Sequence, residues 1–141
     1  MSYDLYIYAE ILKYDTWHCL GDWGESFHPN GRNVTKPAAM LASESIFYGE
    51  DENLFKILGG IDGRTYFYKG MPVNTSVEVL GYYHEMIGHL HDANHLYLKE
   101  LELMPWCAYG LEKSNFVLKT IPKLLKIKEF GDIRVVFWFC G

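Results

Sequence analysis

The chain has 141 residues and a mass of 16.4 kDa, which is enough for one domain with its own core. Hydrophobic residues make up 49% of the sequence and charged residues 22%, which excludes an intrinsically disordered chain, and the net charge of −5 excludes a broad nucleic-acid-binding surface. The aromatic content is high, with 11 Tyr, 8 Phe and 4 Trp. We expect a single α+β domain over residues 1–141.

The N-terminal residues 3–12 (YDLYIYAEIL) alternate with the period of two that is typical of a strand. The apolar face of this strand is expected to point to the core and consists of Leu5, Ile7, Ala9 and Ile11. The opposite face carries tyrosines and Glu10, and we expect it to be half-exposed. Tyr14 and Asp15 are expected to turn the chain into a second strand near residues 17–20.

The middle of the chain combines loop signals with short helices. Residues 21–35 are rich in Gly, Pro and Asn, which is typical of a loop. Short helices are predicted near residues 37–45 and 51–58, and residues 64–69 (RTYFYK) are strand-like. The strongest helix signal covers residues 75–90, where Thr75 and Glu78 have the spacing of a capping box.

The C-terminal third predicts two helices and a buried strand. Residues 96–104 are expected to pass from a strand into a short helix before Pro105, and Ser114 to cap a helix that Pro122 ends or kinks. Residues 133–140 (IRVVFWFC) are continuously apolar, which predicts a central strand covered on both faces. The expected sheet is antiparallel or mixed, includes the first and last strands, and is flanked by short helices.

The cysteines Cys19, Cys107 and Cys140 are odd in number and lack metal-ligand spacing, so we expect reduced thiols in a cytoplasmic protein. Asp4 and Glu10 interrupt the first apolar run, which argues against a signal peptide. No apolar stretch approaches the roughly 20 residues that span a bilayer, and we expect no membrane partner.

Five short motifs occur in a distinctive order at residues 3–10 (YDLYIYAE), 52–58 (ENLFKIL), 70–72 (GMP), 95–101 (HLYLKEL) and 133–139 (IRVVFWF). In this order they resemble a family of small, largely phage-encoded proteins. Its members have a G-x-D-I-H-x-x-x-E strand, an N-Y-D-L-F helix, a W-L-T-L-x-E-L segment and a V-R-I-V-F-x-F-D strand. The family's opening histidine is Tyr6 here and its closing aspartate is Cys140, so this chain keeps Asp4 but lacks the histidine of the family's Asp-x-His pair. The resemblance implies a phage or prophage origin and a role against bacterial immunity in the host cytoplasm.

Four of the six histidines lie within twelve residues, at His84, His89, His91 and His95. His84 and His89 are one residue too far apart for the HExxH zinc motif. On a helix, His91 and His95 have the i,i+4 spacing that can hold one zinc or manganese ion, and His89 or His84 joins them only if the helix breaks near Gly88 or Asp92. The alternatives are histidines that bind a polar ligand or partner, and histidines that are solvated or hydrogen-bonded within the structure.

Two arginines lie beside aromatic residues in strand-like segments, Arg64 near Tyr66 and Arg134 near Phe137. A guanidinium beside rings can hold a phosphate while a ring stacks on a base. The alternative for each is an edge-strand arginine whose head group reaches water. Five lysines in residues 113–128 can steer an anion or form a solvated helix face. The candidate ligand-binding residues are therefore Arg64, Tyr66, Tyr68, His84, His91, His95 and Arg134.

Three functions are compatible with these features. The first is a phage-type counter-defence protein that sequesters a small anionic, nucleotide-derived immune signal without catalysis or a cofactor, in a pocket that a second protomer can complete. The second is an inhibitor that blocks a host defence protein such as a nuclease or CRISPR effector, with Trp17, Trp23 and Trp106 as exposed anchors. The third is a metal-dependent hydrolase with ligands His89, His91 and His95 and the general base Glu85. The lack of a recognisable catalytic motif favours the first.

Overall fold

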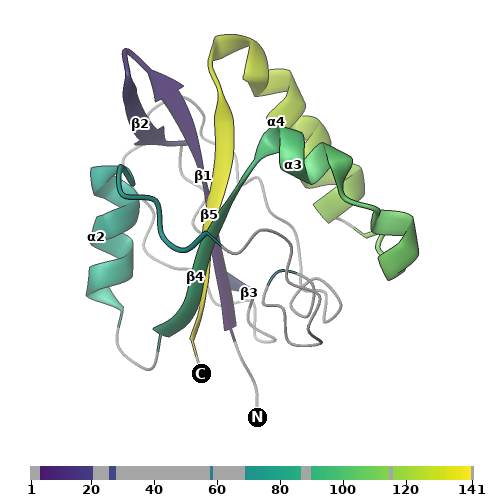
Figure 1. The fold of residues 1–141 in the computed structure, drawn as a ribbon, viewed down its shortest axis with the longest axis horizontal. Helices are drawn as coiled ribbons and strands as arrows, with labels where there is room; N and C mark the ends of the chain where they lie inside the picture. Colours follow the sequence, from purple (N-terminus) through teal and green to yellow (C-terminus); the bar gives the residue numbers. More distant parts are fainter. Residues whose placement is uncertain are drawn as a thin grey trace.

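Helices lie on both sides of an antiparallel sheet in the computed structural model, which describes residues 4–20, 26–27, 58, 69–86, 90–114 and 116–140 (Figure 1). On one side is α2 (Val77–Glu85). On the other side are α3 (Leu98–Leu103) and α4 (Ile121–Ile127). The predicted α+β class, with an antiparallel sheet that includes both the first and the last strand, is confirmed.

The sheet is built around β5 (Ile133–Cys140), in the strand order β2-β1-β5-β4. Its other strands are β1 (Asp4–Lys13), β2 (Thr16–Cys19), β4 (Leu90–Tyr97) and the short β3 (Ser26–Phe27), which pairs with β1. Tyr14 and Asp15 have φ angles of 51° and 62°, which suit the two-residue turn of the predicted β1–β2 hairpin. The first and last strands pair directly, with Glu10 opposite Arg134.

Both faces of β1 are buried, which corrects the expected half-exposed face. Ile7, Ala9 and Ile11 pack in the core beneath α3 and α4, as predicted. Tyr8 and Glu10 on the other face are 0% exposed, because α2 covers that face and packs against its aromatic side chains. The central strand β5 is buried on both faces in the same way, as its continuous apolar sequence predicts.

The helix predicted over residues 75–90 is shorter, because β4 already begins at Leu90. Ser76 is the N-cap instead of Thr75: its Oγ accepts a hydrogen bond from the Val79 N–H at 3.2 Å. The Thr75 hydroxyl donates to the Pro72 carbonyl oxygen at 2.5 Å. The cap is therefore one residue later than the sequence pattern indicates.

The predicted passage from strand to helix near residues 96–104 is confirmed at the junction of β4 and α3. A 3₁₀ turn, η1 (Trp106–Tyr109), follows Pro105. Ser114 caps the next helical segment as predicted, since its Oγ accepts the Val117 N–H at 3.3 Å. This segment begins with the π turn η2 (Phe116–Thr120), continues as α4 and ends in η3 (Lys128–Phe130).

Pro122 does not end that segment. It lies in the first turn of α4, where a missing N–H removes little hydrogen bonding. The predicted helix at 37–45, most of the helix at 51–58 and the strand at 64–69 lie outside the described residues, although Leu58 is helical and buried. None of the helices in the described part of the chain has the length and apolar character that a bilayer span requires.

Candidate functional site

Residues 69–76, which we call the strap, run from the β4 edge of the sheet to the start of α2 (Figure 1). At its first end, the backbone N–H groups of Lys69 and Gly70 donate to Asn94 Oδ1 at 2.8 and 3.2 Å. The Gly70 carbonyl oxygen is 2.8 Å from His95 Nδ1. Two neighbouring residues of β4 therefore hold the start of the strap.

A buried ion pair holds the other end of the strap. Arg134 Nε donates to Glu10 Oε1 at 2.6 Å, and the two side chains are 1% and 0% exposed. Arg134 Nη1 and Nη2 donate to the Asn74 Oδ1 and carbonyl oxygen at 2.9 and 3.2 Å. The Ser76 N–H donates to Glu10 Oε2 at 2.7 Å, so one carboxylate binds both the arginine and the N-terminus of α2.

Aromatic rings and cations from separate stretches of the chain meet beside this ion pair. The Arg134 guanidinium carbon lies 3.9 Å from the centre of the Trp17 ring, and the Trp17 and Tyr97 rings are 6.1 Å apart. Lys69 Nζ lies 4.7 Å from the centre of the Tyr97 ring, and the His95 ring meets Tyr97 edge-on at 5.7 Å. Lys69 also forms an ion pair with Glu100.

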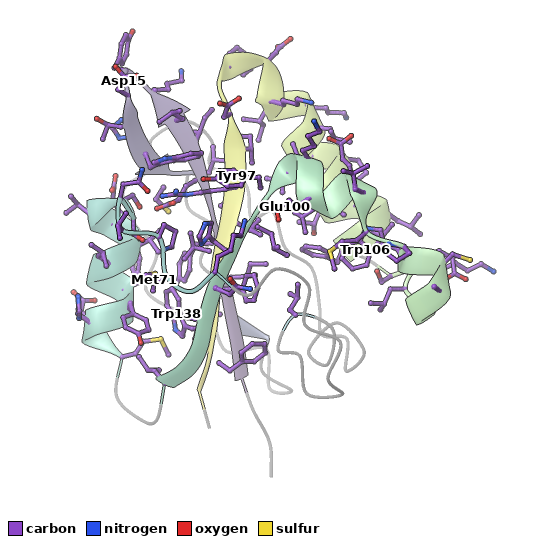
Figure 2. The ribbon with its side chains drawn as sticks, in the orientation of Figure 1. Asp15, Met71, Tyr97, Glu100, Trp106 and Trp138 are labelled. Atoms are coloured by element: carbon purple, nitrogen blue, oxygen red, sulfur yellow. The ribbon has the colours of Figure 1, made fainter. Side chains whose placement is uncertain are left out.

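Figure 2 shows Tyr97 and Glu100 together, where β4 continues into α3. Glu100 Oε1 accepts the Tyr97 N–H at 3.0 Å, which satisfies the backbone donor of the N-cap residue of α3. We call Lys69, His95, Tyr97 and Glu100 the edge cluster. Tyr97 is 40% exposed, and the Lys69 and Glu100 side chains are 29% and 23% exposed. Lys69, Tyr97 and Glu100 are thus the accessible part of the site, while Trp17, Arg134 and His95, which is 9% exposed, are buried.

The His95 imidazole is held in its neutral form. Burial lowers its pKa from 6.5, and the positive charges of Lys69 and Arg134 lower it further, against opposing contributions from the Gly70 carbonyl and Glu100. Because the Gly70 oxygen can only accept, Nδ1 carries the proton and Nε2 is a hydrogen-bond acceptor. The edge cluster therefore combines an exposed ring, an ammonium group and a neutral imidazole.

Two predicted ligand-binding residues, His95 and Arg134, lie close together here, and both contact the strap. Arg134 is a buried positioning residue, because its guanidinium is engaged by Glu10, Asn74 and Trp17. Its alternative interpretation as an edge-strand arginine that reaches water is wrong, since β5 is the central strand.

Other predicted residues lie elsewhere or are not described. His84 lies exposed in the last turn of α2, where its ring meets Tyr83 edge-on at 5.7 Å. The backbone of His91 belongs to β4, but its side chain is outside the description. The remaining predicted residues outside the described part of the chain are Arg64, Tyr66, Tyr68 and His89.

The sequence analysis missed Lys69, Tyr97 and Glu100. The position of Glu100 was a usable local signal, because a glutamate three residues after the N-cap can accept the N-cap N–H. Lys69 had no such signal, since its contacts with β4 and α3 join residues 25 and 31 positions apart.

The helical premise of the metal site is wrong. His91 and His95 lie on β4, with a register shift in the pairing between His91 and Asn94, so the i,i+4 helical spacing does not exist. Within the part of the chain that the structure describes, no group of three or more His, Cys, Asp or Glu side chains is placed to hold a metal ion. A zinc or manganese site that uses His89 and His91 stays a prediction, because those side chains are outside this description.

The tryptophans proposed as surface anchors are core residues where they are described. Trp17 is 6% exposed and Trp106 is 8% exposed. Trp106 Nε1 donates to the Leu101 carbonyl oxygen at 2.8 Å, and the ring packs edge-on against Phe116. Trp23 lies outside the described residues. A protein-binding surface on this molecule therefore needs other anchors than Trp17 and Trp106.

Beneath α2, aromatic rings form a second core. Tyr8 is stacked on Tyr82 and on Trp138, with ring centroids 5.3 and 5.2 Å apart. Figure 2 shows Met71 and Trp138 in the layer between α2 and the sheet. Burial raises the pKa of Tyr82 to about 12 and raises that of Cys19 above its ordinary value. Cys19 is thus a buried, protonated thiol, whereas Cys107 is exposed, and both are free.

Comparisons of the chain with known protein families, with curated proteins and with solved structures found no match. The resemblance to phage-encoded proteins therefore rests on the sequence motifs alone.

Proposed function

We propose that the protein binds a small anionic ligand of the nucleotide class at the edge cluster and retains it unchanged. The observation that carries this proposal is the meeting of the accessible Lys69 and Tyr97 side chains with the largely buried His95 ring at the β4 edge of the sheet. These residues come from the strap and from β4, and the buried Arg134–Glu10 pair fixes the strap against the sheet.

Each group has a distinct role in the proposed complex. The exposed Tyr97 ring stacks on a base, and the Lys69 ammonium exchanges Glu100 for a phosphate of the ligand. His95 Nε2 accepts a hydrogen bond from an N–H or O–H of the ligand. Since Glu100 balances Lys69 and Glu10 balances Arg134, the binding energy comes from stacking and directed hydrogen bonds rather than from net positive charge.

Retention without turnover is supported by the state of the reactive groups near the site. The Glu10 carboxylate is engaged by Arg134 and by the Ser76 N–H, and it is 0% exposed. The Cys19 thiol is buried with a raised pKa, which suppresses the reactive thiolate. The sequence resemblance supports a biological role in which the ligand is a nucleotide-derived immune signal of a bacterial host.

Ligand release after heating tests the proposal. The purified protein is incubated with a panel of cyclic nucleotides and ADP-ribose derivatives, washed and heat-denatured, and the released compounds are identified by mass spectrometry. We expect one compound to be released intact. Release of an altered compound would indicate an enzyme instead, and retention of none would contradict the proposal.

The edge cluster is tested separately by substitution. Tyr97→Leu should weaken binding of the retained compound about tenfold in calorimetric titration, since stacking on an aromatic side chain is worth about 1–3 kcal/mol per base. Lys69→Gln should weaken it about as much, because it removes the ammonium group that contacts the phosphate. Tyr14→Asn is the matched control, because Tyr14 is 97% exposed in the hairpin turn and asparagine tolerates its φ of 51°. If the Tyr97 and Lys69 variants bound the compound as tightly as the Tyr14 variant and the parent, the ligand would bind elsewhere.

A further inference from the structure

The helical segment formed by η2 and α4 exposes an apolar stripe. Its inner residues Phe116, Ile121 and Leu124 belong to the core, whereas Leu118 is 57% exposed and Leu125 is 38% exposed. Pro122, which lies between these leucines at intervals of four and three residues, is also exposed. Such intervals place side chains on one face of a helix, so these three residues form one outward stripe.

Lysines flank this stripe. Lys119 and Lys126 follow Leu118 and Leu125 directly in the sequence, and both are exposed. We call the surface formed by the stripe and these lysines the α4 face, and it consists of Leu118, Lys119, Pro122, Leu125 and Lys126. Residues 113–130 contain five lysines and one glutamate in a chain whose net charge is −5, and Lys128 pairs with Glu102 of α3 at 3.8 Å. Positive charge is therefore concentrated on the segment that also exposes leucine.

We propose that the α4 face is a docking surface for an acidic amphipathic segment of another protein. The exposed side chains of Leu118 and Leu125 are removed from water only when a partner covers them. The charge of the surrounding lysines selects a partner with carboxylates around its own apolar residues. Symmetric pairing of two copies through this face would bring lysines against lysines, so charge complementarity favours a different, acidic chain.

This surface is independent of the edge cluster. The edge cluster lies where the strap, β4 and α3 meet, and its residues contribute no side chain to the α4 face. Docking at the α4 face would give the molecule a protein partner without the buried Trp17 or Trp106 as anchors. A negative docking test would therefore not contradict ligand binding at the edge cluster, and a negative ligand-binding test would not contradict docking at the α4 face.

The test uses two synthetic amphipathic peptides with the same leucine positions, one with glutamate and one with lysine at the remaining positions. Titration of ¹⁵N-labelled full-length protein should move the amide signals of residues 113–130 with the glutamate peptide only. Lys126→Glu and Leu118→Ser should each weaken this binding at least about fivefold, since one contributes charge and the other apolar area. Val77→Ser on α2, which removes an 83% exposed apolar side chain from the other side of the sheet, should leave it unchanged.

Several results would overturn the proposal. These are equal binding of the two peptides, amide shifts outside residues 113–130, and insensitivity to Leu118→Ser in folded protein, as judged by circular dichroism. Self-association that Leu118→Ser abolishes would show that a second copy covers the face. Binding to phosphatidylglycerol vesicles in place of the glutamate peptide would show a lipid surface as the partner.

Discussion

Glu10 and Arg134 are the charged side chains buried most completely among the described residues, and their geometry explains why the fold tolerates them. Removing two charges from water is costly, and attraction between them offsets this only with good geometry and further hydrogen bonds. Here the 2.6 Å contact is supplemented by hydrogen bonds with Asn74 and the Ser76 N–H. These extra partners belong to the strap and to the N-cap of α2, so the pair specifies where both lie on the sheet.

Removing one member of the pair should destabilise the protein strongly. We expect Glu10→Gln or Arg134→Met to lower the free energy of unfolding by about 3–5 kcal/mol, because each leaves a buried group without its charged partner. The double variant should lose less than the sum of the two single losses, since neither charge then remains buried. Urea titration followed by circular dichroism measures these values, and strictly additive losses would contradict the pairing.

The helix α2 depends on its surroundings for stability. With nine residues it is shorter than helices that persist alone in water. The Ser76 cap, the contact of the Ser76 N–H with Glu10, and the packing of Val79 and Tyr82 on the aromatic face hold it in place. Gly81 contributes nothing to this packing, because a Cβ added there would meet no atom within 4 Å.

Gly81→Ala should therefore stabilise the protein by about 0.5–1 kcal/mol, since alanine loses less backbone entropy than glycine in a helix. Gly131→Ala is the matched contrast: a Cβ there would clash with the carbonyl oxygen of Leu12, so this variant should be destabilised. Thermal melting of both variants beside the parent checks the signs. A lower melting temperature for Gly81→Ala would show that α2 is packed on its exposed side.

The contact between His95 and the strap should make stability depend on pH. The folded-state pKa of His95 is lowered, so the unfolded state takes up a proton more readily. The stability that the neutral ring contributes is complete above its unfolded pKa of about 6.5 and is lost as the pH falls through the lowered value. The difference in free energy of unfolding between the parent and His95→Gln should shrink from about pH 8 to about pH 5. A constant difference would contradict this linkage.

At the scale of the whole molecule, one sheet separates two cores of different character. The core beneath α3 and α4 is mainly aliphatic with phenylalanine, and the core beneath α2 is built from tyrosine and tryptophan. The central strand β5 contributes Val135 and Phe137 to the first core and Val136 and Trp138 to the second. Because the two layers share this strand, opening either of them disturbs the same sheet.

Thiol labelling tests this coupling. In a Cys140→Ser background, Cys107 should react quickly with a disulfide reagent, because it is exposed, whereas Cys19 should not react in the folded protein. Reaction of Cys19 should rise with urea in step with loss of near-ultraviolet circular dichroism, since the thiol lies in the core beneath α2. Cys107→Ser should remove the fast phase. Two fast thiols in native buffer would indicate that the core beneath α2 opens independently.

Local patterns in the sequence were sufficient for several elements. The period of two identifies β1, the continuous apolar run identifies β5 as a central strand, and Ser114 marks the start of the last helical segment. The hairpin turn at Tyr14 and Asp15 is likewise a short-range feature. These signals arise from neighbouring residues and therefore survive without knowledge of the fold.

Only the tertiary structure decided the site. Residues 90–97 form a strand because they pair with β5, although their histidine spacing allowed a helical interpretation. Arg134 is buried because Glu10, 124 positions away, neutralises it, and Lys69 reaches the ring of Tyr97 only because the strap is held against β4. Periodicity and capping depend on local geometry, whereas burial and charge pairing depend on which distant segments meet, and one sequence taken alone does not contain that information in readable form.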